Sequence, residues 1–335
     1  MDNPNFLSPW IKRFLLEYLI NVKNLSRNTQ RSYRDTFRLY LPEAAKKSQK
    51  HIDQLTIEDV APEGVKEFLL NLESKRHCSL TTRNQRLAAI HAFAQFVGLN
   101  SPEHVEWCRQ IRQIPFKKSP KTLITYLEKN EMDALLNAPN RSTDQGRRDY
   151  ALLLFLYNTG ARADEAAQLT IEDLDLAHNT KKDFSIVVIR GKGGKIRRCP
   201  LWSNTVKELA SLTSGREQGE HVFLNRLKEP ITRFGIHTMV KRYAKSLFPA
   251  FPSLAKKRVS PHTIRHTTAT HLLHAGVDIN TIRAWLGHVS INTTNVYVEV
   301  DLEMKAKALA CCEVSSKKTR HWRDSKNLMS FLDSL

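Results

Sequence analysis

The chain has 335 residues, of which 41% are hydrophobic and 26% charged, with only 12 glycines and 13 prolines. This composition excludes collagen-like, low-complexity and wholly disordered chains, and the length suits about two globular domains. The 52 Lys and Arg side chains exceed the 34 Asp and Glu side chains, so the formal net charge is +18. Such an excess of positive charge indicates a polyanionic partner.

Neither the apolar segments nor the cysteines suggest a membrane or secreted protein. The longest apolar run covers only residues 150–157, far short of the ~20 residues that span a hydrocarbon core. The start of the chain lacks the basic and apolar segments of a secretory signal. The 5 cysteines contain no Cys-x-x-Cys pair, so we expect reduced thiols. We therefore expect a cytoplasmic protein without a membrane partner, associated with the nucleoid if it is bacterial.

Residues 1–114 show the apolar periodicity of amphipathic helices and few strand signals. Four helices are predicted there, over about 10–22, 27–41, 63–72 and 80–98. Ser26 and Ser79 are the expected N-caps of the second and fourth helices. Gly98 is expected to end the fourth, as C-cap glycines do. We predict a small helical domain.

The segment 115–127 contains two prolines and three lysines, a composition that favours an extended, solvated backbone. We place a linker there and a second domain over 128–300. Helices are predicted in that domain over about 129–138, 147–159, 232–247, 261–274 and 279–286. A β-branched run at 186–189, followed by the glycine-rich turn 191–194, predicts a β-hairpin. The expected fold is an α-helical domain followed by a mixed, mainly helical α/β domain with a small sheet.

The tail 301–335 is mostly polar but contains an apolar cluster. The cluster has helical spacing and consists of Leu328, Met329, Phe331, Leu332 and Leu335. Alone it has little to pack against. It is expected either to dock on a partner subunit or to fold back on its own domain, and the sequence favours neither.

Three separated segments contain side chains suited to phosphate chemistry. The stretch Thr159-Gly160-Ala161-Arg162 ends one helix and begins another, which places Arg162 at a constrained helix entry. Lys192 lies in the hairpin turn, where a long side chain can reach over a ligand. His262 and Arg265 are three residues apart on one predicted helix, so they share a face and can address one ligand. Each of these signals is weak by itself.

With Leu286-Gly287-His288 and Tyr297 added, the set resembles the signature of the tyrosine recombinase (phage integrase) family. That signature is Thr-Gly-x-Arg-x-x-Glu, a hairpin Lys, His-x-x-Arg-His, Leu-Gly-His and a Tyr nine residues after the last His, and all parts occur here in that order. The resemblance covers about 128–300 strongly and the N-terminal helices more loosely. It implies a site-specific DNA recombinase that integrates, excises or resolves DNA.

The resemblance also implies individual roles. Tyr297 would attack a DNA phosphodiester, leaving a 3′-phosphotyrosyl link and a free 5′-hydroxyl. Arg162 and Arg265 would grip the non-bridging oxygens of the phosphate. Glu165 would orient Arg162, and His266 is expected to support the site through a hydrogen bond.

Three further groups would handle protons and charge. The resemblance implies that Lys192 protonates the leaving 5′-oxygen, that His262 assists proton transfer at the tyrosine, and that His288 donates to the phosphate. Lys195 is a rival for the acid role, although Lys192 matches the family position. Glu299 stands where family members often have a histidine, a departure that we do not expect to remove activity.

The chemistry of the residues supports a reaction without metal or other cofactor. A phosphodiester gains negative charge in its transition state, which demands positive donors. Guanidinium groups stay charged and make paired bonds to phosphate oxygens, so they can replace metal ions. A tyrosine of pKa ~10 needs nearby cations or a base to become a nucleophile. A covalent intermediate conserves the bond energy, so rejoining needs no ATP.

Clustered carboxylates raise the alternative of a metal-dependent nuclease. They are Asp164, Glu165, Glu172, Asp173 and Asp175. Two-metal chemistry needs carboxylates that converge from separated segments, whereas these crowd one short region. A solvated helix end is therefore the expected structure. Asp164, two residues after the signature arginine, is expected to compete with phosphate to a small degree.

The expected partner is duplex DNA, clamped between the two domains. Basic side chains on two N-terminal helices are candidates for contacting it, namely Arg27, Arg31, Arg34, Arg83 and Arg86. The resemblance implies a homotetramer on paired DNA sites and leaves accessory proteins open. Two alternatives remain: a type IB topoisomerase that relaxes DNA as a monomer, and a non-catalytic DNA-binding regulator with the same fold.

Overall fold

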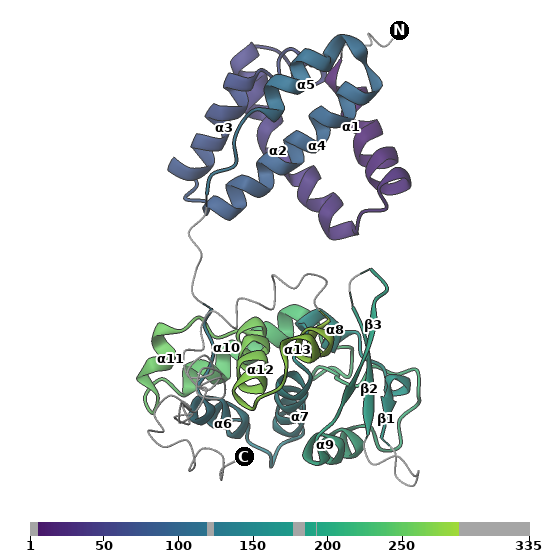
Figure 1. Ribbon diagram of the computed structural model, residues 1–335, viewed down its shortest axis with the longest axis vertical. Coiled ribbons are helices and arrows are strands. Elements are labelled where there is room, and N and C mark those ends of the chain that lie inside the picture. The colour runs from purple at the N-terminus through teal and green to yellow at the C-terminus, as the bar shows by residue number, and fades with distance from the viewer. Residues whose placement is uncertain (1–5, 119–123, 177–184, 192, 288–335) are drawn as a thin grey trace, which may run out of the picture. The chain divides into compact units, whose positions relative to one another are not determined.

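The computed structural model describes residues 6–118, 124–176, 185–191 and 193–287 (Figure 1). The chain forms two compact units, Met1–Thr122 and Leu123–Leu335. The division between them falls within the segment 115–127, where the proline and lysine content predicts a linker.

The first unit is helical. Its α-helices are α1 (Leu7–Arg13), α2 (Arg27–Ser48), α3 (Pro62–Ser74), α4 (Leu80–Asn100) and α5 (Val105–Arg112). A π-helix, Phe14–Val22, continues directly from α1, and 3₁₀ turns cover Ile52–Gln54 and Pro102–His104. Aromatic rings hold the helices together, because Phe93 of α4 lies 5.4 Å from Phe14 and 5.2 Å from Phe37, both between ring centroids.

Gly98 does not end α4, contrary to the prediction. The helix continues to Asn100. A Cβ at Gly98 would lie 2.8 Å from Cβ of Cys108 on α5, so the glycine allows two helices to pack closely. The helix α5, which has eight residues, was not predicted.

The second unit combines helices with one small sheet. Its helices are α6 (Lys129–Asn137), α7 (Asp144–Thr159), α8 (Ala163–Ala167), α9 (Ser203–Thr213), α10 (Arg233–Ser246), α11 (Pro252–Lys256), α12 (Pro261–His274) and α13 (Ile279–Leu286). Its strands are β1 (Leu174–Asp175), β2 (Ile186–Arg190) and β3 (Ile196–Pro200).

The predicted hairpin is confirmed as β2 and β3, which pair antiparallel with Val188 opposite Arg198. The strand β1 extends the sheet in the order β1-β2-β3. The mainly helical fold with a small sheet is therefore the one predicted. The helix expected to begin at Arg162 is confirmed as α8, whereas α9, α11 and β1 were not predicted.

The helix α7 is central to this unit, and α12 packs directly against it (Figure 1). Residues 151–156 of α7 are consecutively buried, as expected for a helix enclosed on all sides. The helix ends at Gly160, whose φ is +59°. A Cβ at Gly160 would also lie 2.4 Å from Cδ2 of Leu286 in α13. This glycine thus provides both a left-handed cap and the space for a neighbouring helix.

Gly160→Ala is expected to lower the free energy of unfolding by about 2 kcal/mol or more, because left-handed backbone strain adds to overpacking. Denaturant unfolding followed by circular dichroism measures the loss. The matched control is Gly219→Ala, since a Cβ there would meet nothing within 4 Å, and its change should stay within about 0.5 kcal/mol. Equal stability of the two variants would contradict the role given to Gly160.

Within the described ranges, the structure contains no helix that combines the length and the apolar character needed to cross a lipid bilayer.

Candidate active site

Arg162 and Glu165 form an ion pair with two hydrogen bonds at the start of α8. Arg162 is the N-cap residue, and its backbone N–H donates to Oε2 of Glu165 at 2.9 Å. Nη1 of Arg162 donates to Oε1 of the same carboxylate at 2.7 Å. Asp164, the carboxylate expected to compete for this arginine, is exposed, and the described partner of Arg162 is Glu165. The pair leaves the Arg162 side chain 37% exposed.

Glu165 is shared with a second arginine that the sequence analysis did not single out. Nη2 of Arg197, on β3, donates to Oε2 of Glu165 at 2.7 Å. Burial by itself would raise the pKa of Glu165, but the hydrogen bonds and charges of Arg197 and Arg162 lower it to about 2. Strand alternation is the signal that could have revealed Arg197, because it shares a sheet face with the buried Cys199.

The clustered carboxylates do not form a solvated helix end as predicted. Glu165 and Asp173 are buried, whereas the other three are exposed. Asp173 pairs with Arg190, with 3.1 Å between Oδ1 and Nη2, and its Oδ2 accepts from the Thr170 hydroxyl at 2.9 Å. The prediction is wrong for these two because sheet and turn contacts bury them. Across the described part of the chain, no three His, Cys, Asp or Glu side chains gather as metal ligands.

Arg265 was predicted to share an open helix face with His262, but it lies deeper in the protein. It is 4% exposed. Its Nη1 donates to the Gly160 carbonyl and its Nη2 to the Leu286 carbonyl, each at 2.6 Å. Helix ends have carbonyls without intrahelical partners and a partial negative charge. One guanidinium therefore ties the ends of α7 and α13 to α12.

The two histidines of the signature differ in exposure. His262 is exposed, and its ring lies edge-on to His237 of α10 with 6.2 Å between centroids. Partial desolvation lowers the pKa of His262, and the nearby His237, Arg265 and Arg162 lower it further. His266 is half-buried, and burial together with His262 and Arg265 lowers its pKa to about 4. These shifts favour the neutral form of both imidazoles at pH 7.

Arg162 and Arg265 are distant in the chain, yet both are close enough to His262 to affect its pKa. The packing of α8 and of α12 against α7 and α10 therefore gathers three of the predicted site residues. Lys192, His288 and Tyr297 lie outside the described residues, as does the apolar cluster of the tail.

The neighbours of two of these residues are described. A Cβ on Gly191 would lie 3.3 Å from Oε1 of Glu165, and a Cβ on Gly287 would lie 3.2 Å from Cδ of Arg197. The residues just before Lys192 and His288 therefore lie against the Glu165–Arg197 pair. Lys195, the rival for the acid role, is exposed.

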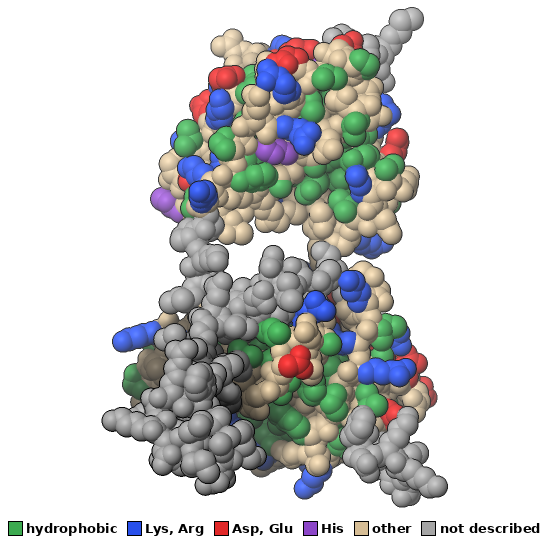
Figure 2. Space-filling view, in the orientation of Figure 1, with side chains coloured by type: hydrophobic (Ala, Val, Ile, Leu, Met, Phe, Trp, Pro, Cys, Tyr) green, Lys and Arg blue, Asp and Glu red, His purple; other side chains and the backbone are tan. Residues whose placement is uncertain are grey.

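Three of the predicted DNA-contacting arginines lie on one helix of the first unit. Arg27, Arg31 and Arg34 are exposed on α2 at spacings of four and three residues, which share a helix face. Nη2 of Arg34 lies 2.7 Å from Oδ1 of Asp35. Figure 2 shows Lys and Arg side chains on the visible faces of both units, as the net charge leads one to expect.

The other two are structural. Arg83 is 6% exposed, and its Nη1 donates to the Pro115 carbonyl at 3.0 Å. Nη1 of Arg86 donates to the Ser32 carbonyl at 2.8 Å and so joins α4 to α2. Because it is buried, Arg83 is less suited than the three arginines of α2 to contact DNA.

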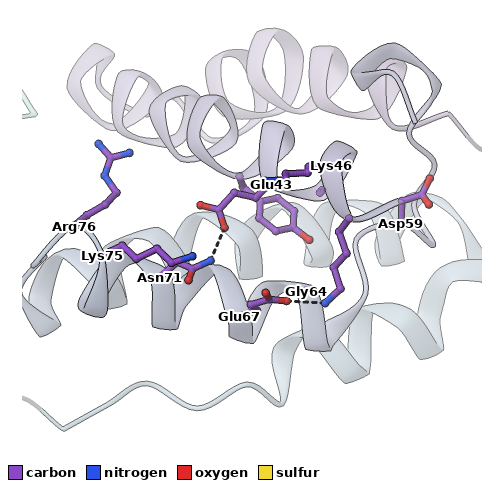
Figure 3. A pocket seen from close by; sticks show the side chains of 11 residues that line it. Glu43, Lys46, Asp59, Gly64, Glu67, Asn71, Lys75 and Arg76 are labelled. Atoms are coloured by element: carbon purple, nitrogen blue, oxygen red, sulfur yellow. Dashed lines mark hydrogen bonds and ion pairs between the residues drawn. The ribbon is translucent and has the colours of Figure 1, made fainter. Parts of the chain in front are cut away.

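A cavity of about 510 Å³ lies between α2 and α3 in the first unit (Figure 3). Side chains of both charges line it. Nζ of Lys47 donates to Glu67 at 2.8 Å, and Nδ2 of Asn71 donates to Glu43 at 3.1 Å. None of the residues that line this cavity belongs to the family signature.

Comparison with known proteins shows the family to which the chain belongs. Residues 125–304 match the family described as "Phage integrase family", and residues 11–98 match "Phage integrase, N-terminal SAM-like domain". The chain belongs to this family, the tyrosine recombinases.

Full-length relatives support the assignment. The protein y4rC of Sinorhizobium fredii (strain NBRC 101917 / NGR234), named as an integrase/recombinase, is 37% identical over 98% of both chains. A protein of Pelobacter propionicus named tyrosine recombinase XerC is 30% identical over 88% of this chain and 91% of its own.

Solved structures share the fold. The Tn1549 transposon integrase in complex with a circular intermediate DNA is 19% identical, with a TM-score of 0.67 over 89% of this chain and 98% of the other. XerH recombinase bound to its difH substrate is 20% identical, with a TM-score of 0.64 over 91% and 95%.

Proposed function

We propose that this protein is a site-specific recombinase that cuts and rejoins duplex DNA through a 3′-phosphotyrosyl intermediate, without a metal ion. Family membership supports the class of reaction. The observation that carries the assignment of residues is that Arg265 and Arg162 both lie near His262, with Arg265 hydrogen-bonded to the Gly160 carbonyl two residues before Arg162. Positive donors and a neutral base are what phosphoryl transfer to a tyrosine requires.

In the proposed cleavage step, the Tyr297 oxygen bonds to the scissile phosphorus and the bond to the 5′-oxygen breaks. His262 takes the phenolic proton, because a neutral imidazole can accept one. Lys192 gives a proton to the leaving 5′-oxygen. Reversal of these transfers rejoins a strand, and the covalent link preserves the bond energy in between.

The arginines and His288 act on the phosphate itself. Arg162 is oriented by Glu165 and partly exposed, so its guanidinium is suited to bind a non-bridging oxygen. Arg265 is assigned to the same phosphate from a guanidinium that is fixed by two helix ends. Prepositioned donors of this kind lower the barrier without reorganisation during the reaction.

DNA binding and assembly extend the proposal. The exposed face of α2 with Arg27, Arg31 and Arg34 is suited to phosphate contacts. The Tn1549 integrase and XerH structures are described as complexes with DNA, which supports duplex DNA as the partner here. We extend the assignment to a homotetramer on two DNA sites, with the tail 301–335 linking neighbours. Relatives named as recombinases disfavour the topoisomerase and regulator alternatives.

A nicked suicide substrate tests the proposal. The duplex is first selected by binding from random DNA, and a nick beside the cleavage point lets a short fragment dissociate so that rejoining fails. In EDTA, wild-type protein is expected to form a covalent adduct that survives denaturation and leaves a 3′-phosphotyrosyl peptide after proteolysis. A requirement for magnesium, or tight binding without any adduct, would refute it. Relaxation of plasmids that lack the selected site would favour the topoisomerase alternative.

A further inference from the structure

Arg197 connects three segments of the second unit. Its side chain is 9% exposed, and its Nη2 donates to Glu165 at 2.7 Å. A Cβ on Gly287 would lie 3.2 Å from its Cδ and 3.4 Å from its Nη1, and a Cβ on Gly191 would lie 3.9 Å from Nη1. The three segments adjoin residues predicted to act on the phosphate, namely Arg162, Lys192 and His288.

The Glu165 carboxylate is divided between two arginines. Oε1 accepts from Arg162 and Oε2 accepts from Arg197. A pair of Arg162 and Glu165 alone would have no net charge, whereas the three groups together keep one positive charge. Arg162 is 37% exposed and Arg197 only 9%, so the solvent-accessible arginine is the one that can offer this charge to a ligand.

Because Glu165 is buried, its sharing between two arginines affects the charge that Arg162 can offer. Charges that are shielded from water interact more strongly than surface charges, and removing one partner of a buried pair leaves the other charge uncompensated. Without Arg197, the full charge of Glu165 would act on Arg162 alone. The guanidinium of Arg162 would then be neutralised by its own orienting carboxylate.

We propose that Arg197 is a positioning residue for strand cleavage. It neutralises Glu165, so that Arg162 keeps its positive charge for the scissile phosphate. Its packing also holds the segments that precede Lys192 and His288 against α8. The proposal rests on the proposed recombinase function, and it concerns a residue that is not part of the family signature.

Three variants test the charge role by single-turnover cleavage of the suicide substrate. Arg197→Gln is expected to slow cleavage by about 100-fold, in the range that loss of one phosphate donor produces. Arg197→Lys keeps the charge and should stay within about tenfold of wild type. The double variant Glu165→Gln with Arg197→Gln removes both charges and should cleave at least about tenfold faster than Arg197→Gln alone. A purely structural role would make the double variant no better.

Arg198→Gln is the matched control, because Arg198 is the next residue of β3, is exposed and loses the same charge. Its cleavage rate and DNA dissociation constant should equal those of the wild type, and Arg197→Gln should also bind DNA normally. The inference is overturned if Arg197→Gln cleaves at the wild-type rate or if the double variant is as slow as the single one. If Arg197→Gln does not fold, a folded Arg197→Lys variant slowed by about 100-fold overturns it instead. Failure of the wild type to form any adduct would refute the proposed function itself.

Discussion

Tyr297→Phe is expected to abolish the covalent protein–DNA product while leaving the DNA dissociation constant unchanged. The substitution removes only the oxygen that forms the bond to phosphorus, so no alternative nucleophile remains at that position. Denaturing gels of the suicide-substrate reaction measure the adduct, and gel-shift titration measures binding. Tyr150→Phe is the control: its hydroxyl accepts from Asn204, and adduct formation should persist.

The contacts of other tyrosines in the second unit support Tyr297 as the nucleophile. The hydroxyls of Tyr150, Tyr157 and Tyr243 are each hydrogen-bonded to another side chain. Burial raises the pKa of Tyr157 to about 12, which makes that phenol a still poorer nucleophile at neutral pH. An adduct trapped with the Tyr297→Phe variant would show that a different group attacks the phosphate.

Arg265→Lys is expected to slow cleavage by at least about 100-fold, although the positive charge is retained. Two separate nitrogens of the guanidinium serve the Gly160 and Leu286 carbonyls. A single ammonium cannot reproduce this planar arrangement. At least one buried carbonyl then loses its donor, at a cost of about 1–3 kcal/mol in the free energy of unfolding.

Cleavage and stability must be measured together for this variant. Single-turnover rates at temperatures where the protein is fully folded isolate the catalytic effect, and denaturant unfolding gives the structural one. Arg226→Lys, at an exposed position, should change neither. Wild-type cleavage by a folded Arg265→Lys variant would remove Arg265 from the phosphate-binding set and leave it only the helix-joining role.

Two helices of the second unit were predictable from the sequence with their bounds. The predicted helices 261–274 and 279–286 have the bounds found in the structure, where the side chains of Ser260 and Asp278 cap their first turns. The helix predicted over 147–159 begins earlier, at Asp144. There the hydroxyl of Thr143 accepts from the Gly146 backbone, a cap that the apolar pattern does not reveal.

Charged residues were the least predictable. Arg83 and Arg86 were expected on a DNA-facing surface, yet Nη1 of each donates to a backbone carbonyl of a neighbouring segment. Asp173 was expected at a solvated helix end, yet it is buried and paired with Arg190. The cost of burying a charge depends on whether another segment supplies the partner, and that partner is far away in the sequence.

By itself, the sequence determined the class of fold, the division between a helical part and a mixed part, and the family signature, because these depend on local periodicity and on the order of motifs. Only the tertiary structure decided that Arg265 ties two helix ends, that Gly98 admits a neighbouring helix, and that Arg197 shares Glu165 with Arg162. Each of these depends on segments that meet through packing, and the balance between burial and pairing of a polar group exists only after they meet.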